Sequence, residues 1–227
     1  MGTSSVKALL VSESGKVEKS VSPLYEFSTP KPMWAETHPI LWWEATQKAI
    51  RDLLDGLDPS SISSVGLTGQ MHGLVAMDGK GQVLRPCIMW NDQRSYRECD
   101  EVTSIIGRSE ILKITGNPVL AGFTAPKILW MQKNEPELFA KIDKVLLPKD
   151  YIRYQLTGEF FTDVSDASGT CMLNVGERSW SSSILDAMGW SKRWMPEVTE
   201  STELTSRISV SGSESTGLSV GTPVVAG

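Results

Sequence analysis

Two apolar runs, each ending in a polar loop, constrain the fold of this chain more than any other feature. The run Ile62–Leu67 is rich in β-branched residues and ends at the loop 69–73, which reads GQMHG. A second run, Cys87–Trp90, ends at the polar cluster Asn91–Arg94. Asp-Gly in the stretch 78–81 predicts a β-hairpin between them. Because ligands of open α/β sheets bind where strands end in loops, we expect both loops to border one site.

The remaining sequence alternates helical and extended patterns, which predicts an α/β fold. Apolar residues at helical spacing, with Pro or Gly at the ends, predict helices at residues 39–54, 92–106, 124–133, 136–142, 148–157 and 180–188. Strands are predicted at residues 8–11, 17–27, 62–67, 74–77, 82–84, 87–90, 144–147 and 222–227. Residues 201–221 are poor in large apolar side chains, so we expect a mobile surface stretch there.

Composition excludes several classes of protein. The net charge is −5 and no basic run is present, which argues against a nucleic-acid partner. No apolar segment approaches the roughly 20 residues of a membrane span. Three cysteines without CxxC spacing indicate reduced thiols, so a cytoplasmic protein is expected.

Single residues in these loops allow more than one interpretation. His72 is a candidate ligand-binding group, but a lone histidine in a turn is more often a surface or capping residue. Met71 taken alone could be core filler. Asn91 and Asp92 could line an active site, although Asp92 could also cap the helix that follows it. Asp166, on a Ser- and Thr-rich segment, could position a substrate or merely bond its own loop.

The N-terminal turn is a candidate phosphate site. Thr3, Ser4 and Ser5 follow Gly2 and offer backbone N–H groups and hydroxyls in a row, and Lys7 adds a positive charge. Taken alone this signal is weak, because Gly/Ser/Thr turns are common. The chain contains neither a P-loop nor a Rossmann fingerprint.

Taken together, the motifs resemble a known family. The segments GQMHG, RPxIxWNDxR, GFTAPK and LPKDYIRYQLTGEF resemble the xylulokinase branch of the FGGY carbohydrate kinases. This resemblance implies a ribonuclease H-like (actin/hexokinase-type) fold: a mixed five-stranded sheet with helices on both faces and a helical insertion from Thr103 to Leu156. It implies that Met71 and His72 contact a ketose sugar. It also implies that Gly2–Lys7 is the family's first phosphate loop, DxGTSxxK.

The resemblance further implies how the chain works. Residues 1–227 are expected to be the N-terminal domain, with a first strand before Gly2 and a C-terminal lobe after Gly227 that carries the catalytic aspartate. No catalytic residue and no metal ligand is therefore expected in residues 1–227. The implied activity is ATP- and Mg²⁺-dependent phosphorylation of D-xylulose at its 5-hydroxyl, with the C-terminal lobe as partner and a homodimer as a possible assembly. The alternatives are a related kinase for ribulose or glycerol, and a sugar-binding module without catalysis.

Overall fold

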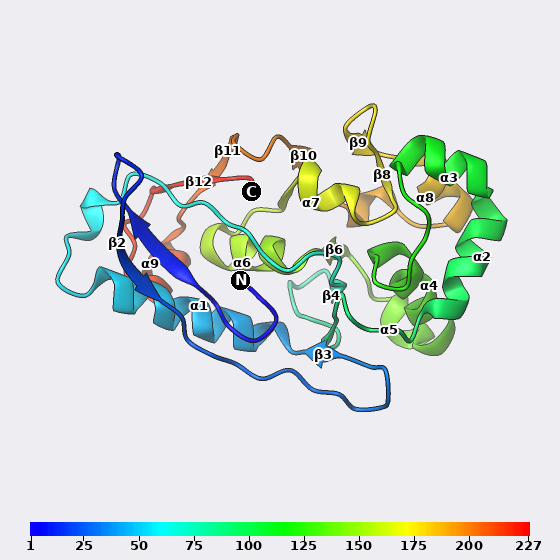
Figure 1. Ribbon diagram of the computed structural model, residues 1–227, viewed down its shortest axis with the longest axis horizontal. Helices are drawn as coiled ribbons and strands as arrows, with labels where there is room; N and C mark the ends of the chain where they lie inside the picture. The colour runs from blue at the N-terminus through cyan, green and yellow to red at the C-terminus, as the bar shows by residue number, and fades with distance from the viewer.

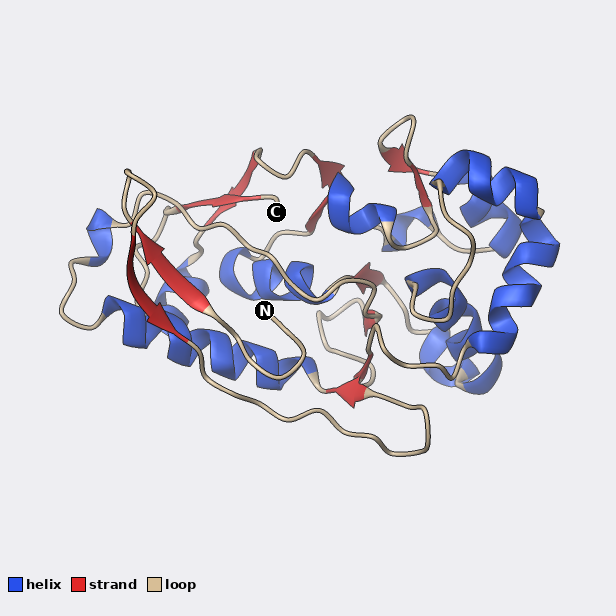
Figure 2. Cartoon of the chain, viewed as in Figure 1, coloured by secondary structure: helices blue, strands red, loops and turns tan.

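The computed structural model describes residues 1–227 as an elongated α/β molecule (Figure 1). The helices are α1 (Pro39–Leu54), α2 (Tyr96–Ile106), α3 (Arg108–Thr115), α4 (Thr124–Asn134), α5 (Pro136–Phe139), α6 (Pro148–Thr157), α7 (Val164–Ser168), α8 (Ser182–Met188) and α9 (Val210–Thr216). Two 3₁₀ turns are η1 (Pro59–Ser61) and η2 (Lys192–Trp194). The strands are β1 (Ala8–Val11), β2 (Val17–Val21), β3 (Glu36–Thr37), β4 (Val75–Met77), β5 (Cys87–Ile88), β6 (Lys144–Leu146), β7 (Phe161–Asp163), β8 (Leu173–Asn174), β9 (Ser179–Trp180), β10 (Glu197–Thr199), β11 (Leu204–Arg207) and β12 (Pro223–Val225). Helices α2, α3, α4, α5 and α8 gather at one end, whereas α1, α6 and α9 lie among strands in the middle and at the other end (Figures 1 and 2).

The strands pair two by two, so the α/β class is confirmed but the single five-stranded sheet is not formed. The pairs are β1–β2, β3–β5, β4–β6, β8–β9 and β11–β12, all antiparallel, and β7–β10, which is parallel. Isolated bridges link the pairs, as between Leu74 and Ile88. The expected strand at 62–67 is reduced to one such bridge: Val65 donates to Pro223 O at 2.8 Å and accepts from Val225 N at 3.1 Å.

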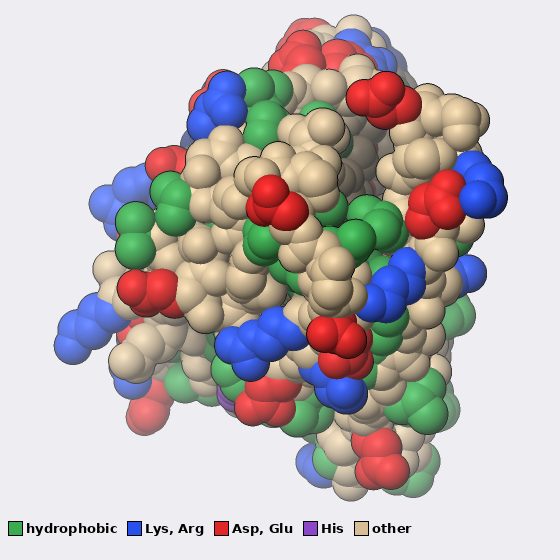
Figure 3. Space-filling model, turned by 90° about the vertical axis from the view of Figure 1, so that its left-hand side faces the viewer, with side chains coloured by type: hydrophobic (Ala, Val, Ile, Leu, Met, Phe, Trp, Pro, Cys, Tyr) green, Lys and Arg blue, Asp and Glu red, His purple; other side chains and the backbone are tan.

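The surface at the β1–β2 end mixes charges of both signs. Figure 3 shows Lys and Arg interspersed with Asp and Glu over this face, with apolar side chains between them. Large apolar side chains are nevertheless exposed on this part of the chain, including Leu9, Val11, Val17 and Leu24. No helix is both long enough and apolar enough to span a bilayer.

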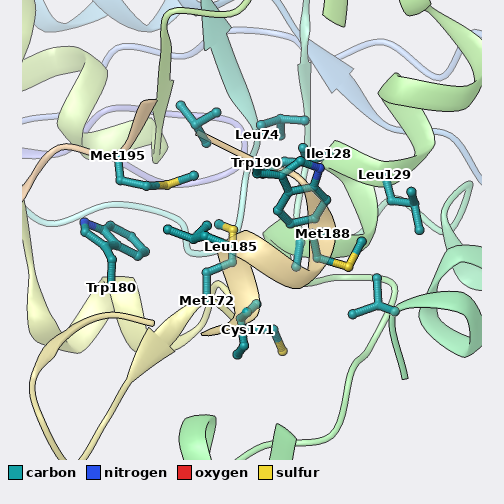
Figure 4. Close-up of a cluster of buried hydrophobic side chains, with 14 of the residues drawn as sticks. Leu74, Ile128, Leu129, Cys171, Met172, Trp180, Leu185, Met188, Trp190 and Met195 are labelled. Carbon is teal, nitrogen blue, oxygen red and sulfur yellow. The ribbon is translucent and has the colours of Figure 1, made fainter. Parts of the chain in front are cut away.

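The molecule has two hydrophobic cores. The larger core lies among α2, α3, α4 and α8, and Figure 4 shows Trp190 beside Ile128 within it. The second core joins α1 to β4, α6 and the residues that flank α9, Ile208 and Leu218, and Trp42 and Leu156 are wholly buried there. The helical insertion that we expected from Thr103 to Leu156 is therefore wrong at its C-terminal end. Since β6 pairs with β4 and α6 packs on α1, both belong to the central part, whereas α8 joins the helical end.

The expected mobile stretch at 201–221 is also wrong, because it holds β11 and α9. β11 pairs with β12, and α9 packs against α6 and α1. A Cβ placed on Gly212 would lie 2.0 Å from Leu156 O, so only glycine permits this close approach of α9 to α6. Small residues that suggest mobility in the sequence here serve close packing.

Candidate active site

An open cleft of about 580 Å³ lies where several loops meet near the middle of the molecule. The loop 67–72 forms one wall, and the segment 163–169, which contains the end of β7 and α7, forms another. Phe123 before α4 and Lys149 at the start of α6 complete it. The predicted residues Met71, His72 and Asp166 all line this cleft, so folding brings together segments almost 100 residues apart in the sequence.

His72 is held in one orientation and one tautomer. Its Nδ1 lies 2.7 Å from the carbonyl oxygen of Gly169, which accepts only, so Nδ1 carries the proton and Nε2 remains the ring's acceptor. The ring packs on Phe123 with centroids 4.5 Å apart. Burial lowers the pKa of His72 below its ordinary value. The neutral imidazole can therefore accept a hydrogen bond from a hydroxyl group.

The backbone of His72 is strained and fixed by its surroundings. Its φ of 64° lies in the left-handed region, which costs a non-glycine residue about 1–3 kcal/mol. Its carbonyl oxygen accepts from Thr124 Oγ1 at 3.1 Å and from Lys127 Nζ at 2.9 Å. Beside it, Met71 is 45% exposed and offers an apolar thioether surface to the cleft. The arrangement suits a ligand with hydroxyl groups and apolar carbon faces.

A buried cluster of charged side chains lies at the wall formed by the segment 163–169. Lys149 Nζ lies 2.6 Å from Asp150 Oδ1 and 2.9 Å from Asp163 Oδ1. Asp163 Oδ2 also accepts from Ser201 Oγ at 2.6 Å and from Ser165 N at 3.1 Å. Although burial opposes it, the Lys149 ammonium lowers the pKa of Asp163. Asp163 is thus a fully engaged carboxylate, and it caps α7.

Asp166 differs from its neighbours because its Oδ2 is buried without a hydrogen-bond partner. Burial, followed by the nearby charge of Asp150, raises the pKa of Asp166 to about 7. At neutral pH its carboxyl group is therefore available both as a donor and as an acceptor. A buried polar atom without a partner in the cleft is suited to a polar ligand.

Asn91 and Asp92 lie outside this cleft. Asp92 is wholly buried, and its oxygens accept from Ala35 N at 2.6 Å and from Arg94 Nε and N at 2.9 and 2.8 Å. Arg94 stacks 3.7 Å from the ring centroid of Trp34 and also pairs with Glu36. Asn91 borders a separate surface depression beside Trp34. Asp92 serves the packing of these segments, since both its oxygens are engaged within the fold.

The N-terminal turn also lies outside the cleft but is joined to it. Gln70 N donates to Met1 O at 2.8 Å, which ties the turn to the cleft loop. The backbone N–H groups of Thr3, Ser4 and Ser5 have no acceptor within the chain, and Lys7 is exposed. Successive free N–H groups beside a lysine fit the oxygens of a phosphate group.

The residues around the cleft do not form a magnesium site. No group of three or more His, Cys, Asp and Glu side chains is arranged to hold a metal ion in residues 1–227. Asp150 and Asp163 are already paired with Lys149. These residues alone do not fit Mg²⁺.

Several residues of the cleft were missed by sequence reasoning. Phe123, Lys149 and Ser201 line it, as does Asn117. Lys149 lies within the family-like segment LPKDYIRY, so its position in that motif could have indicated it. Ser201 had no such signal, because its only visible context was a Ser/Thr-rich stretch.

A family profile for the N-terminal domain of the FGGY family of carbohydrate kinases matches residues 1–227. The chain belongs to the FGGY family of carbohydrate kinases. Among FGGY relatives, the xylulose kinase of Escherichia coli (strain K12) is 43% identical over 227 residues, which are 100% of this chain and 46% of that protein. The chain thus spans about half the length of the curated relatives it matches.

Solved FGGY structures share the fold. The crystal structure of a xyloylose kinase from Brucella ovis matches with a TM-score of 0.91 and 41% identity over 100% of this chain and 46% of that one. A gluconate kinase from Lactobacillus acidophilus matches with a TM-score of 0.93 and 28% identity over the same shares. The resemblance and the sugar-kinase fold expected from the motifs are confirmed.

Proposed function

We propose that this chain is the sugar-binding lobe of an enzyme that uses ATP to convert D-xylulose to D-xylulose 5-phosphate. The observation that carries the proposal is His72, whose ring is fixed in the cleft with Nε2 left as an acceptor. The similarity to xylulose kinases along the whole chain supports the choice of sugar.

Three cleft residues make different contacts with the sugar. His72 Nε2 accepts a hydrogen bond from a sugar hydroxyl, and Met71 packs on the apolar face of the sugar. Asp166 offers a second polar contact, because its Oδ2 has no partner within the chain. Each good hydrogen bond to a buried group contributes about 0.5–1.5 kcal/mol to recognition.

The N-terminal turn binds the phosphate groups. Thr3, Ser4, Ser5 and Lys7 hold phosphate oxygens of ATP through backbone N–H groups, hydroxyls and one ammonium. Phosphoryl transfer depends mainly on positioning and charge neutralisation. The aspartate that takes the proton of the sugar hydroxyl belongs to the C-terminal lobe, and Mg²⁺ binds with the help of groups outside residues 1–227.

The proposal includes the setting of the enzyme. The C-terminal lobe is the partner that closes over the cleft, and the full-length protein forms a homodimer. The three cysteines are unpaired, in keeping with a cytoplasmic enzyme.

Kinetics of the full-length protein test the proposal. D-Xylulose, D-ribulose, gluconate and glycerol are compared as acceptors in a coupled ADP-release assay. We expect kcat/KM to be highest for D-xylulose, and a preference for another acceptor would contradict the choice of sugar. His72→Ala should lower kcat/KM for D-xylulose roughly 5- to 150-fold, which corresponds to a loss of about 1–3 kcal/mol of transition-state binding. His38→Ala is the matched control, because His38 is exposed at the N-terminus of α1.

A protein that binds D-xylulose but shows no ADP release with any acceptor would instead be a sugar-binding module. Isothermal titration with D-xylulose, run beside the kinetic assay, separates this outcome from a kinase with another substrate.

A further inference from the structure

Lys127 is a wholly buried lysine that forms no ion pair. It lies in the first turn of α4 with 0% exposure, and no carboxylate lies within ion-pair distance of its ammonium. Burying an unpaired ammonium is unfavourable, and burial lowers the pKa of Lys127 to about 7. A methionine would fill the same space without this penalty. The presence of the lysine therefore points to what its N–H groups contact.

Those N–H groups join two backbone turns. Lys127 Nζ donates to His72 O at 2.9 Å and to Gly122 O at 2.7 Å. His72 provides the cleft imidazole, and Gly122 directly precedes Phe123, which packs on that imidazole. A Cβ on Gly122 would lie 2.8 Å from Trp90 O, so this turn has no room to relax toward Trp90. One ammonium thus fixes the spacing between two walls of the cleft.

We propose that Lys127 is a positioning residue for sugar recognition. It acts through His72 and Phe123 and does not touch the sugar, an inference that rests on the proposed function of the cleft. His72 must keep a left-handed backbone conformation with φ of 64° to direct its ring to Gly169 O. Thr124 Oγ1 supplies one donor to the His72 carbonyl, and Lys127 supplies the second and links it to the next turn. Without that link, the backbone of His72 can relax and the ring loses its fixed direction.

A purely structural role for Lys127 predicts different behaviour. A structural lysine would lower the melting temperature when removed and reduce all kinetic constants through loss of folded enzyme. A positioning lysine affects sugar binding selectively. Because Lys127→Met removes a buried unpaired charge while keeping side-chain volume, we expect its melting temperature to stay within about 3 °C of the wild type.

The first test measures kinetics on the full-length protein. Lys127→Met is compared with Lys133→Met, which removes a half-exposed lysine of the same helix that pairs with Glu98 and Glu101. We expect Lys127→Met to raise KM for D-xylulose at least tenfold, since a displacement of about 1 Å can cost up to 100-fold, with KM for ATP within twofold. Lys133→Met should leave both values unchanged. An unchanged sugar KM, or equal changes in both KM values, would overturn the proposal.

The second test needs no sugar, so its failure is separate from failure of the proposed function. Residues 1–227 contain only two histidines, His38 and His72, which NMR of ¹⁵N-labelled imidazoles can follow. We expect wild-type His72 to show a neutral ring with Nδ1 protonated. The Lys127 charge also lowers the pKa of His72, after the larger effect of burial. Lys127→Met should therefore raise that pKa and weaken the Nδ1–H tautomer, while His38 signals stay the same. An unchanged His72 tautomer and titration would show that Lys127 does not position it.

Discussion

Replacing Gly169 with alanine should displace the His72 ring without straining the backbone. A Cβ at Gly169 would lie 2.3 Å from His72 Cε1 and 2.5 Å from Nδ1. Gly169 has φ −80° and ψ 6°, the conformation of residue i+2 in a type I turn, which alanine can also adopt. The substitution therefore acts on the imidazole and leaves the local chain conformation intact.

The size of the effect follows from these distances. An ordinary carbon–carbon contact is about 3.5 Å, so the ring must move by roughly 1 Å. The 2.7 Å hydrogen bond from Nδ1 to Gly169 O is then lost, at a cost of about 0.5–1.5 kcal/mol. Misplacement of about 1 Å in a binding group can reduce rates up to 100-fold. We therefore expect kcat/KM for the sugar to fall about 10- to 100-fold, equivalent to about 1.4–2.7 kcal/mol. Alanine also reduces the conformational freedom of the unfolded chain, which stabilises the folded protein by about 0.4–1 kcal/mol. Because this gain offsets the loss of the hydrogen bond, we expect the stability to be nearly unchanged.

The assay compares Gly169→Ala with Gly176→Ala in the full-length protein. Gly176 lies between β8 and β9, and a Cβ there would meet only Asn174 Oδ1, at 3.5 Å. Both variants should melt within a few degrees of the wild type, and only Gly169→Ala should lose sugar turnover. If Gly169→Ala folds and keeps kcat/KM within twofold, the fixed ring of His72 is not important for sugar recognition, and the reasoning is refuted.

Two further predictions concern stability. Because the pKa of Asp166 is raised to about 7 in the folded protein, the folded state binds more protons than the unfolded state between about pH 4 and 7. The wild type should thus lose stability as pH rises through this window, on the order of 2–4 kcal/mol, and Asp166→Asn should lose less. If the melting temperatures of the two proteins changed equally from pH 5 to pH 8, this prediction would be contradicted. Asp92→Ala leaves buried Arg94 without its bidentate partner and should cost about 3–5 kcal/mol in urea unfolding, whereas a loss below about 1 kcal/mol would show that Glu36 suffices for Arg94.

Elements whose signals are local were predictable from the sequence. Helix α1 has Pro39 in its first turn and His38 as its cap, where His38 Nδ1 accepts from Ile40 N at 3.3 Å. The Asp78 turn forms as expected, because the Asp78 side chain accepts from Gln82 N at 2.9 Å. The loop GQMHG lies at the cleft, as its glycines and polar residues indicated. In α1 and the Asp78 turn, the interactions that form the element lie within a few residues of one another.

Partners that are distant in the sequence were decided only by the tertiary structure. Nothing near Asp92 in the sequence shows that Ala35 N would occupy one of its oxygens, and Lys149 meets Asp163 only when α6 packs beside β7. The segment 201–221 is compact because Gly212 approaches Leu156 O, a contact that composition cannot reveal. The tautomer of His72 depends on a carbonyl 97 residues away. Periodicity and capping are short-range properties written along the chain, whereas burial, pKa and ion pairing depend on which segments meet in space.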